Sequence, residues 1–204
     1  MIETNELDRA IEHLKSGGVV AVAHETYFTL CADARRASAI DAVFALKERE
    51  EPRACAVLLP SVEAWTSFAR EIPTTAQRLA TRFWPGPLTI ALPAADESQA
   101  ALRFRGRIAV RVPGPSPALD LVRAFGGPLT ATSANPSGAP SSRTDDDVRA
   151  YFTGRGSLMI LRGQADGGMP STVVEIDGAA LSVVRAGAIP QSVLEAAAEG
   201  EAAA

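Results

Sequence analysis

The sequence predicts one α/β domain built on a mixed β-sheet. Helical repeats of apolar residues alternate with short apolar runs early in the chain, and strand-like runs cluster near its C-terminus. With 204 residues, 47% of them hydrophobic and 22% charged, the chain has the size and composition of one globular domain. No linker-like segment divides it. We therefore expect one domain over residues 1–190 and a short C-terminal helix or frayed tail over residues 191–204.

Local patterns predict each element in turn. Four apolar residues between Leu7 and Leu14 recur with helical spacing; Thr4 or Asn5 can cap this helix, and two glycines at 17 and 18 end it. The run Val19–Ala23 is predicted as a buried strand that leads into a polar loop over residues 24–29. Further helices are expected over residues 38–46, 61–70, 74–83, 116–125 and 144–152, and further strands over residues 55–59, 88–92, 107–112, 128–132, 158–161, 171–176 and 181–185.

Charge and composition narrow the possible functions. The net charge of −4 disfavours a protein that mainly coats nucleic acid, although a local basic patch stays possible. The apolar runs are much shorter than the ~20 residues of a membrane span, and the N-terminus is acidic, so we expect a cytoplasmic protein without membrane partners. Cys31 and Cys55 form no CxxC pair, and the histidines are His13 and His24, so free thiols and no metal site are expected.

The first candidate group is Lys47 with Arg49. The sequence lacks GxxxxGK[ST], GxGxxG and GxSxG motifs, so its chemistry must come from other polar segments. Lysine is rare here, with two lysines among 20 basic residues. Two positions apart on a helix, Lys47 and Arg49 would point away from each other, so they can face one anion only if the helix ends there, as Pro52 indicates. The alternative is a solvated, self-paired charge run.

Other polar groups lie near predicted strand ends. Thr132, Ser133 and Asn135 follow an apolar run and could bind phosphate oxygens, although an ordinary turn explains their composition nearly as well. His24 could act as a general base, or only pack and form hydrogen bonds. Four arginines share one parity, which a strand would turn to one solvated or anion-binding face: Arg103, Arg105, Arg107 and Arg111.

Taken in order, these segments resemble the YrdC-like family of threonylcarbamoyl-AMP synthases, in its short bacterial form of the TsaC type. The likeness covers residues 7–190. The motifs that carry it are GGVVA at 17–21, ET at 25–26, ADA at 32–34, KxR at 47–49, FWPGPLT at 83–89, RVP at 111–113, PLxxTSANxSG at 128–138, STVVE at 171–175 and RxG at 185–187.

The resemblance implies a twisted mixed sheet, flanked by helices, around a basic concave cavity. It also implies a reaction that joins L-threonine, bicarbonate and ATP, with Mg²⁺ entering with the ATP. The threonine amine would take up bicarbonate as a carbamate, whose oxygen attacks the α-phosphate and releases pyrophosphate. A partner transferase would then move the threonylcarbamoyl group to N6 of adenosine 37 in tRNA. Direct binding of tRNA to this chain is left open.

The family's functional positions carry over to matching residues of this chain. The residues that match the catalytic set are Lys47, Arg49, Ser133 and Asn135. Thr26 matches the position that holds threonine, and His24 and Glu25 lie beside it. The same resemblance assigns ATP binding to Lys47, Arg49, Arg111, Thr132, Ser133, Asn135, Ser171 and Arg185.

One segment departs from the family pattern. AHETYFTL stands at residues 23–30, where Pro-Thr-Asp/Glu-Thr-x-Tyr-Gly-Leu is usual. Two alternatives therefore stay open. One is a paralogue that adenylates a different amine or carbamate, and the other is a non-catalytic RNA-binding module.

Overall fold

A computed structural model describes residues 2–48, 55–95 and 100–200. The helices, including two short 3₁₀ helices, are α1 Thr4–Lys15, α2 Ala37–Leu46, η1 Glu63–Ser67, α3 Thr74–Phe83, η2 Ala100–Leu102, α4 Pro117–Phe125, α5 Asp145–Phe152 and α6 Gln191–Glu199. The strands are β1 Val19–Ala23, β2 Phe28–Cys31, β3 Ala56–Leu58, β4 Leu88–Pro93, β5 Arg107–Arg111, β6 Leu129–Ser133, β7 Leu158–Ile160, β8 Thr172–Asp177 and β9 Ala180–Arg185.

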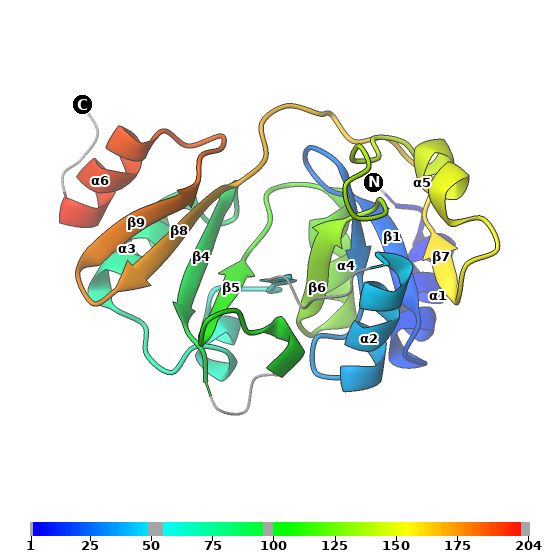
Figure 1. Ribbon diagram of the computed structural model, residues 1–204, viewed down its shortest axis with the longest axis horizontal. Coiled ribbons are helices and arrows are strands. Elements are labelled where there is room, and N and C mark those ends of the chain that lie inside the picture. Colours follow the sequence, from blue (N-terminus) through cyan, green and yellow to red (C-terminus); the bar gives the residue numbers. More distant parts are fainter. Residues whose placement is uncertain (1, 49–54, 96–99, 201–204) are drawn as a thin grey trace.

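Within the described residues, nine strands form one mixed sheet in the order β7-β1-β2-β6-β3-β5-β4-β8-β9. Three neighbouring pairs are parallel (β1 with β7, β3 with β5, β4 with β8), and the other five are antiparallel. Helices α1, α2, α4 and α5 pack around the β1 end of the sheet, and α3 and α6 pack at the β4 and β9 end (Figure 1). The predicted α/β class on a mixed sheet is confirmed.

Alternation along the central strands gives the sheet two unlike faces. On β5, Ile108 and Val110 are fully buried in the core, while Ala109 and Arg111 point to the opposite, hollowed face. On β3, Val57 belongs to the core while Ala56 faces the hollow. One face therefore carries most of the bulky residues, and the other carries small and polar ones with a few larger apolar residues such as Leu58 and Val173.

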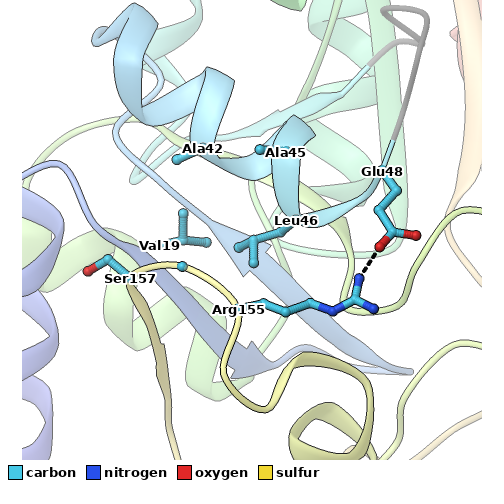
Figure 2. Close-up of a pocket in the computed structure, with 8 residues that line it drawn as sticks. Val19, Ala42, Ala45, Leu46, Glu48, Arg155 and Ser157 are labelled. Carbon is cyan, nitrogen blue, oxygen red and sulfur yellow. Dashed lines mark hydrogen bonds and ion pairs between the residues drawn. The ribbon is translucent and has the colours of Figure 1, made fainter.

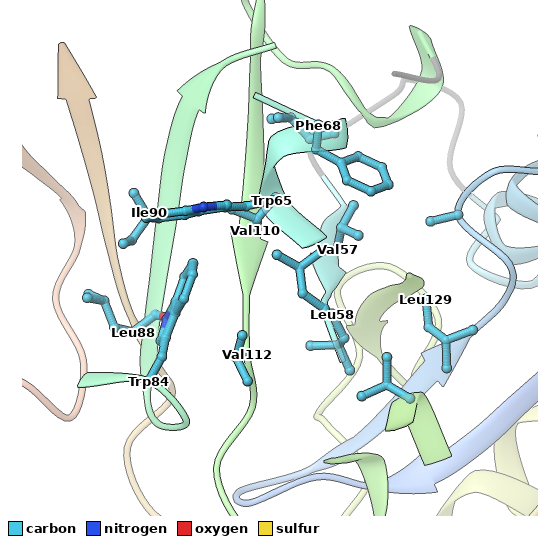
Figure 3. Packing of buried hydrophobic residues seen from close by; sticks show 14 of the residues in the cluster. Val57, Leu58, Trp65, Phe68, Trp84, Leu88, Ile90, Val110, Val112 and Leu129 are labelled. Atoms are coloured by element: carbon cyan, nitrogen blue, oxygen red, sulfur yellow. The ribbon is translucent and has the colours of Figure 1, made fainter. Parts of the chain in front are cut away.

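Two tryptophans anchor the bulky face. The rings of Trp65 and Trp84 meet edge to face, with 5.3 Å between their centroids (Figure 3). The Trp84 Nε1–H donates to the carbonyl oxygen of Leu88 over 2.7 Å, so the buried ring leaves no unsatisfied donor. Ile90 and Val110 pack beside the two rings, which ties β4 and β5 to the segment around η1.

The polar loop expected over residues 24–29 is too long, because its last two residues belong to β2. Phe28 pairs with Ala23 of β1, and Thr29 pairs with Ser133 of β6. The Phe28 side chain is fully buried. β2 lies between two strands, so its backbone groups are paired on both sides. Only residues 24–27 form the connecting loop.

The helix expected over residues 61–70 is found, but it is shorter than expected. Only the 3₁₀ helix η1 forms there. Trp65 and Phe68 are three residues apart and both buried, and a 3₁₀ turn places such positions on one side. The expected cap of α2 is also displaced, because the helix begins at Ala37 and Ser38 lies inside it.

The C-terminal segment is packed rather than frayed as far as Glu199. Helix α6 packs against α3, and Leu194 is fully buried. Cys31 and Cys55 are both buried and form no disulfide, as expected. No helix among the described residues is long and apolar enough to cross a membrane.

Replacing Trp84 with alanine should lower the free energy of unfolding by about 3–5 kcal/mol, because it removes a buried ring and leaves a cavity beside Trp65. Urea denaturation measures the change. Phe104→Ala is the matched control, since Phe104 is 45% exposed, and its effect should stay below about 1 kcal/mol. Equal effects of the two variants would contradict the packing described here.

Candidate functional site

Two hollows in the described part of the chain differ in character. One, of about 460 Å³, lies under the end of α2 and is lined by apolar residues such as Val19 and Leu46, with an ion pair between Glu48 and Arg155 at its edge (Figure 2). The other, of about 770 Å³, lies on the open face of the sheet and is lined by hydroxyl groups and arginines together with alanines and a few larger apolar residues such as Leu58. Chemistry on charged substrates needs such donors, so the larger hollow is the candidate site.

The candidate cavity is formed by the small and polar face of the central strands. Its floor includes Ala56, Ala109 and Ala131, whose small side chains leave room above the sheet. The cavity brings together predicted site residues from distant parts of the chain, namely His24, Thr26, Arg111, Thr132, Ser133, Ser171 and Arg185. Lys47, Glu25 and Asn135 are not among its lining residues, and Arg49 lies outside the described residues.

Lys47 lies directly behind the cavity wall. Helix α2 ends at Leu46, as predicted, and Lys47 is its C-cap. The Lys47 side chain is 1% exposed, and its Nζ donates to the Ser133 carbonyl oxygen over 2.5 Å and to Ser133 Oγ over 3.3 Å. The Ser137 amide donates to the Lys47 carbonyl oxygen over 3.1 Å. The buried ammonium thus touches Ser133, which itself lines the cavity.

The Asn135 side chain forms hydrogen bonds with the backbone of the turn that follows it. Its Nδ2 donates to the carbonyl oxygens of Pro136 (2.9 Å) and Ala139 (2.7 Å), which holds the turn that follows β6. Its Oδ1 is buried and has no hydrogen-bond partner among the described residues. The turn interpretation therefore accounts for the Asn135 amide group, while Ser133 and Thr132 line the cavity.

Arg185 and Ser171 form a donor pair at the opposite end of the cavity. The Arg185 guanidinium donates from NH2 to the Ser171 carbonyl oxygen (2.8 Å) and to Ser171 Oγ (2.9 Å). The Ser171 hydroxyl is also hydrogen-bonded to the Thr89 hydroxyl over 3.0 Å. Sequence reasoning missed Thr89 as a lining residue, although it lies in the FWPGPLT motif. This pair presents hydroxyl and guanidinium donors suited to phosphate oxygens.

Glu25 and Arg111 form an ion pair in the cavity wall. Arg111 NH2 donates to Glu25 Oε1 over 2.5 Å, and the Gly114 amide donates to the same oxygen over 2.7 Å. Arg111 Nε donates to the Gly86 carbonyl oxygen over 2.8 Å. Burial raises the pKa of Glu25, but the His24 ring and the Arg111 charge outweigh it and bring this pKa to about 2. The carboxylate therefore stays ionised at neutral pH.

The four arginines at alternating positions between residues 103 and 111 do not lie on one face of a strand. Only Arg107 and Arg111 lie in β5, because the strand begins at Arg107. Arg107 contacts Glu175 and Asp177 of β8 rather than the cavity. Among these four arginines, only Arg111 lines the cavity.

Glu25→Gln should change how stability depends on pH. The folded-state pKa lies below the ordinary value of 4.5, so the stabilisation is complete above pH 4.5 and is lost as pH falls toward 2. In the wild-type protein this loss should reach up to about 3 kcal/mol. Glu25→Gln should be less stable at pH 7, since Arg111 loses its partner, and should lose less on acidification. Urea titrations at several pH values measure both effects.

The control for this pH experiment is Glu3→Gln, since Glu3 is exposed. Its acid dependence should match that of the wild-type protein. An unchanged profile in Glu25→Gln would contradict the ion pair.

Two relatives carry the same descriptive name. A threonylcarbamoyl-AMP synthase of Pyrococcus abyssi (strain GE5 / Orsay) is 32% identical over 195 residues, which cover 95% of this chain and 57% of the relative. A threonylcarbamoyl-AMP synthase of Halorhodospira halophila (strain DSM 244 / SL1) is 35% identical over 144 residues, covering 70% of this chain and 75% of the relative. This chain therefore spans little more than half the length of the Pyrococcus relative.

A solved structure gives the corresponding match in three dimensions. The crystal structure of P. abyssi Sua5 complexed with L-threonine aligns with a TM-score of 0.89 at 32% sequence identity, over 97% of this chain and 58% of that chain. The family model Sua5_yciO_yrdC, described as "Telomere recombination", matches residues 12–187. The match spans most of the sequence and includes both ends of the candidate cavity, so this chain belongs to the Sua5/YciO/YrdC family.

Proposed function

We propose that this chain is a threonylcarbamoyl-AMP synthase, which joins L-threonine, bicarbonate and ATP to give threonylcarbamoyl-AMP and pyrophosphate. One observation carries the proposal. A single cavity of about 770 Å³ gathers two donor clusters, Ser133 backed by Lys47 and Ser171 paired with Arg185, in a fold shared with a relative solved with L-threonine. The names of the relatives support the same assignment.

The chemistry needs positioning and charge stabilisation more than a protein nucleophile. A carbamate oxygen of the substrate attacks the α-phosphorus, and the bond to the leaving pyrophosphate breaks. Negative charge then builds on the phosphoryl oxygens and on the leaving group. Donors that are already fixed in the cavity wall stabilise this charge without having to reorganise. Lys47 holds Ser133 in this way, and Ser171 holds Arg185.

We assign separate groups of lining residues to the nucleotide and to the amino acid. Thr132, Ser133, Ser171 and Arg185 bind the nucleotide phosphates, with Lys47 supplying positive charge behind Ser133. The loop over residues 24–27 meets the amino acid, with Thr26 as its contact. Arg49 is assigned to the same phosphates from the family pattern alone.

A magnesium site built by the protein does not fit the cavity. Mg²⁺ prefers carboxylate and phosphate oxygens, and the described lining residues include no Asp or Glu. The described residues also contain no group of three His, Cys, Asp or Glu side chains that could hold a metal. We therefore propose that any Mg²⁺ is carried by the phosphates of ATP, and no step is assigned to a protein-bound ion.

The product would be an activated acyl-type adenylate, which needs an acceptor. We propose that a threonylcarbamoyl transferase receives it and modifies adenosine 37 of tRNA in the cytoplasm. Whether tRNA itself contacts this chain is a separate proposal, which RNA-binding measurements at several salt concentrations would test.

Lys47→Met should abolish threonine-dependent release of pyrophosphate, with a loss of at least about 100-fold, because the buried charge behind Ser133 disappears. Methionine matches the length of the lysine stem, so the fold should persist in a thermal melt. Lys15→Met is the matched control, since Lys15 is the only other lysine and pairs with Glu12 on the surface of α1.

Full activity of Lys47→Met would contradict the assignment. Release that needs another amine instead of threonine would favour a paralogue. Salt-dependent RNA binding by the wild-type protein without any turnover would favour the RNA-binding module.

Arg185→Gln should weaken ATP binding roughly 10- to 100-fold, since charge-assisted hydrogen bonds to a phosphate contribute about 1.5–3 kcal/mol. Calorimetric titration with ATP measures the change. Arg9→Gln is the control, because Arg9 is exposed on α1, and its affinity should equal that of the wild-type protein. Unchanged affinity in Arg185→Gln would place the phosphates elsewhere.

A further inference from the structure

His24 and Glu25 form a carboxylate–imidazole pair at the edge of the candidate cavity. His24 lies in the loop between β1 and β2, and its side chain is only 10% exposed. His24 Nδ1 contacts Glu25 Oε2, while Glu25 Oε1 is held by Arg111 and the Gly114 amide. One carboxylate oxygen is therefore fixed by Arg111 and Gly114, and the other contacts the imidazole ring.

The position of the ring proton follows from this contact. Glu25 Oε2 is buried and has no other hydrogen-bond partner among the described residues. The Glu25 amide also lies 2.9 Å from His24 Nδ1. If Nδ1 accepted from that amide, its lone pair would face the unpaired carboxylate oxygen, which is repulsive. We therefore assign the proton to Nδ1, where it bonds to Oε2, and this leaves Nε2 as a lone-pair acceptor.

The His24 ring lines the cavity, and its Nδ1 side is taken up by Glu25. No residue in the described ranges forms a hydrogen bond with Nε2. The charged groups that act on the ring are Glu25, from the same loop, and Arg111, from β5. Burial and Arg111 lower the pKa of His24 from its ordinary value of 6.5, while Glu25 acts in the opposite direction. The imidazole is therefore neutral at pH 7.

The other described lining residues offer no comparable base. Their titratable groups are the guanidinium groups of Arg111 and Arg185 and the phenol of Tyr27. Guanidinium groups are always protonated, and a neutral phenol is not a base that takes a proton from an ammonium group. The two arginines in the cavity wall also disfavour a further positive charge there. A substrate ammonium that enters the cavity would therefore lose a proton more readily than it does in water.

We propose that His24 is a catalytic base, which accepts through Nε2 the ammonium proton of the amino-acid substrate, a role that rests on the proposed function. The ammonium becomes a free amine, and His24 becomes an imidazolium paired with Glu25. The amine nitrogen then forms a bond to the bicarbonate carbon. The C–O bond to the hydroxyl group breaks, and that hydroxide leaves as water with a second proton from the amine. The products are a carbamate and water, and the imidazolium later releases its proton to solvent.

The test compares His24→Gln with His13→Gln. His13 is the only other histidine and lies on α1, where its ring contacts the Ser157 carbonyl oxygen. Threonine-dependent pyrophosphate release is measured from pH 5.5 to 9 with saturating ATP. At pH 7, kcat/KM for threonine should fall by about 100-fold or more in His24→Gln, and stay unchanged in His13→Gln. ATP affinity should be unchanged in both.

The pH profile separates a base from a structural residue. In the wild-type protein kcat/KM should be level above the pKa of His24 and fall below it. In His24→Gln it should rise about tenfold per pH unit, because only amine deprotonated in solution can react. Added imidazole should restore activity to His24→Ala, whose missing ring leaves room for it.

The outcomes distinguish this inference from the proposed function. Wild-type rates in His24→Gln, or a change in KM alone without a new pH slope, would overturn the role of His24 and leave the synthase intact. A wild-type protein that shows no threonine-dependent release would overturn both.

Discussion

The candidate site depends on the alternation of side chains along the central strands. Successive residues of a strand point to opposite faces, so each of these strands must supply bulky residues to one face and small or polar residues to the other. β5 does this with Val110 in the core and Arg111 in the cavity, and β4 does it with Ile90 and Thr89. A register slip of one residue would place arginine in the core and fill the cavity with valine. The same packing that stabilises the fold thus keeps the cavity open.

Each cation near the cavity is held by a fixed partner. Arg111 is paired with Glu25, Arg185 bonds to Ser171, and the Lys47 ammonium bonds to Ser133. Partly buried charges without partners are strongly destabilising, so these contacts offset the cost of burying each cation. They also keep the donors in place before a substrate arrives, which is the condition for electrostatic catalysis. Stability and substrate binding therefore rest on the same hydrogen bonds.

Much of the fold could be predicted from the sequence, because most strands are apolar runs and most helices show an apolar repeat. β2 was missed because it is only four residues long and follows directly on a polar loop. The helix expected around Trp65 is shorter than predicted and of the 3₁₀ type, which the apolar pattern does not distinguish because both kinds of helix place residues three apart on one side. Local sequence patterns do not reveal constraints that come from tertiary packing.

The candidate site was predictable in its residue types but not in its contacts. The rarity of lysine singled out Lys47, yet nothing in the sequence showed that the side chain is buried behind Ser133. The ion pair of Glu25 with Arg111 joins residues 86 positions apart, which no local pattern reveals. Asn135 carries the residue type expected for substrate binding, and nothing in the sequence showed that its amide group also holds the turn after β6.

The most direct measurement is the mass of the adenylated product formed from ATP, L-threonine and bicarbonate labelled with carbon-13. The account predicts a threonylcarbamoyl-AMP whose mass shifts with the label, because the bicarbonate carbon lies between the amine and the phosphoryl oxygen. An adenylate whose mass is unaffected by the label, or no adenylate at all, would contradict it.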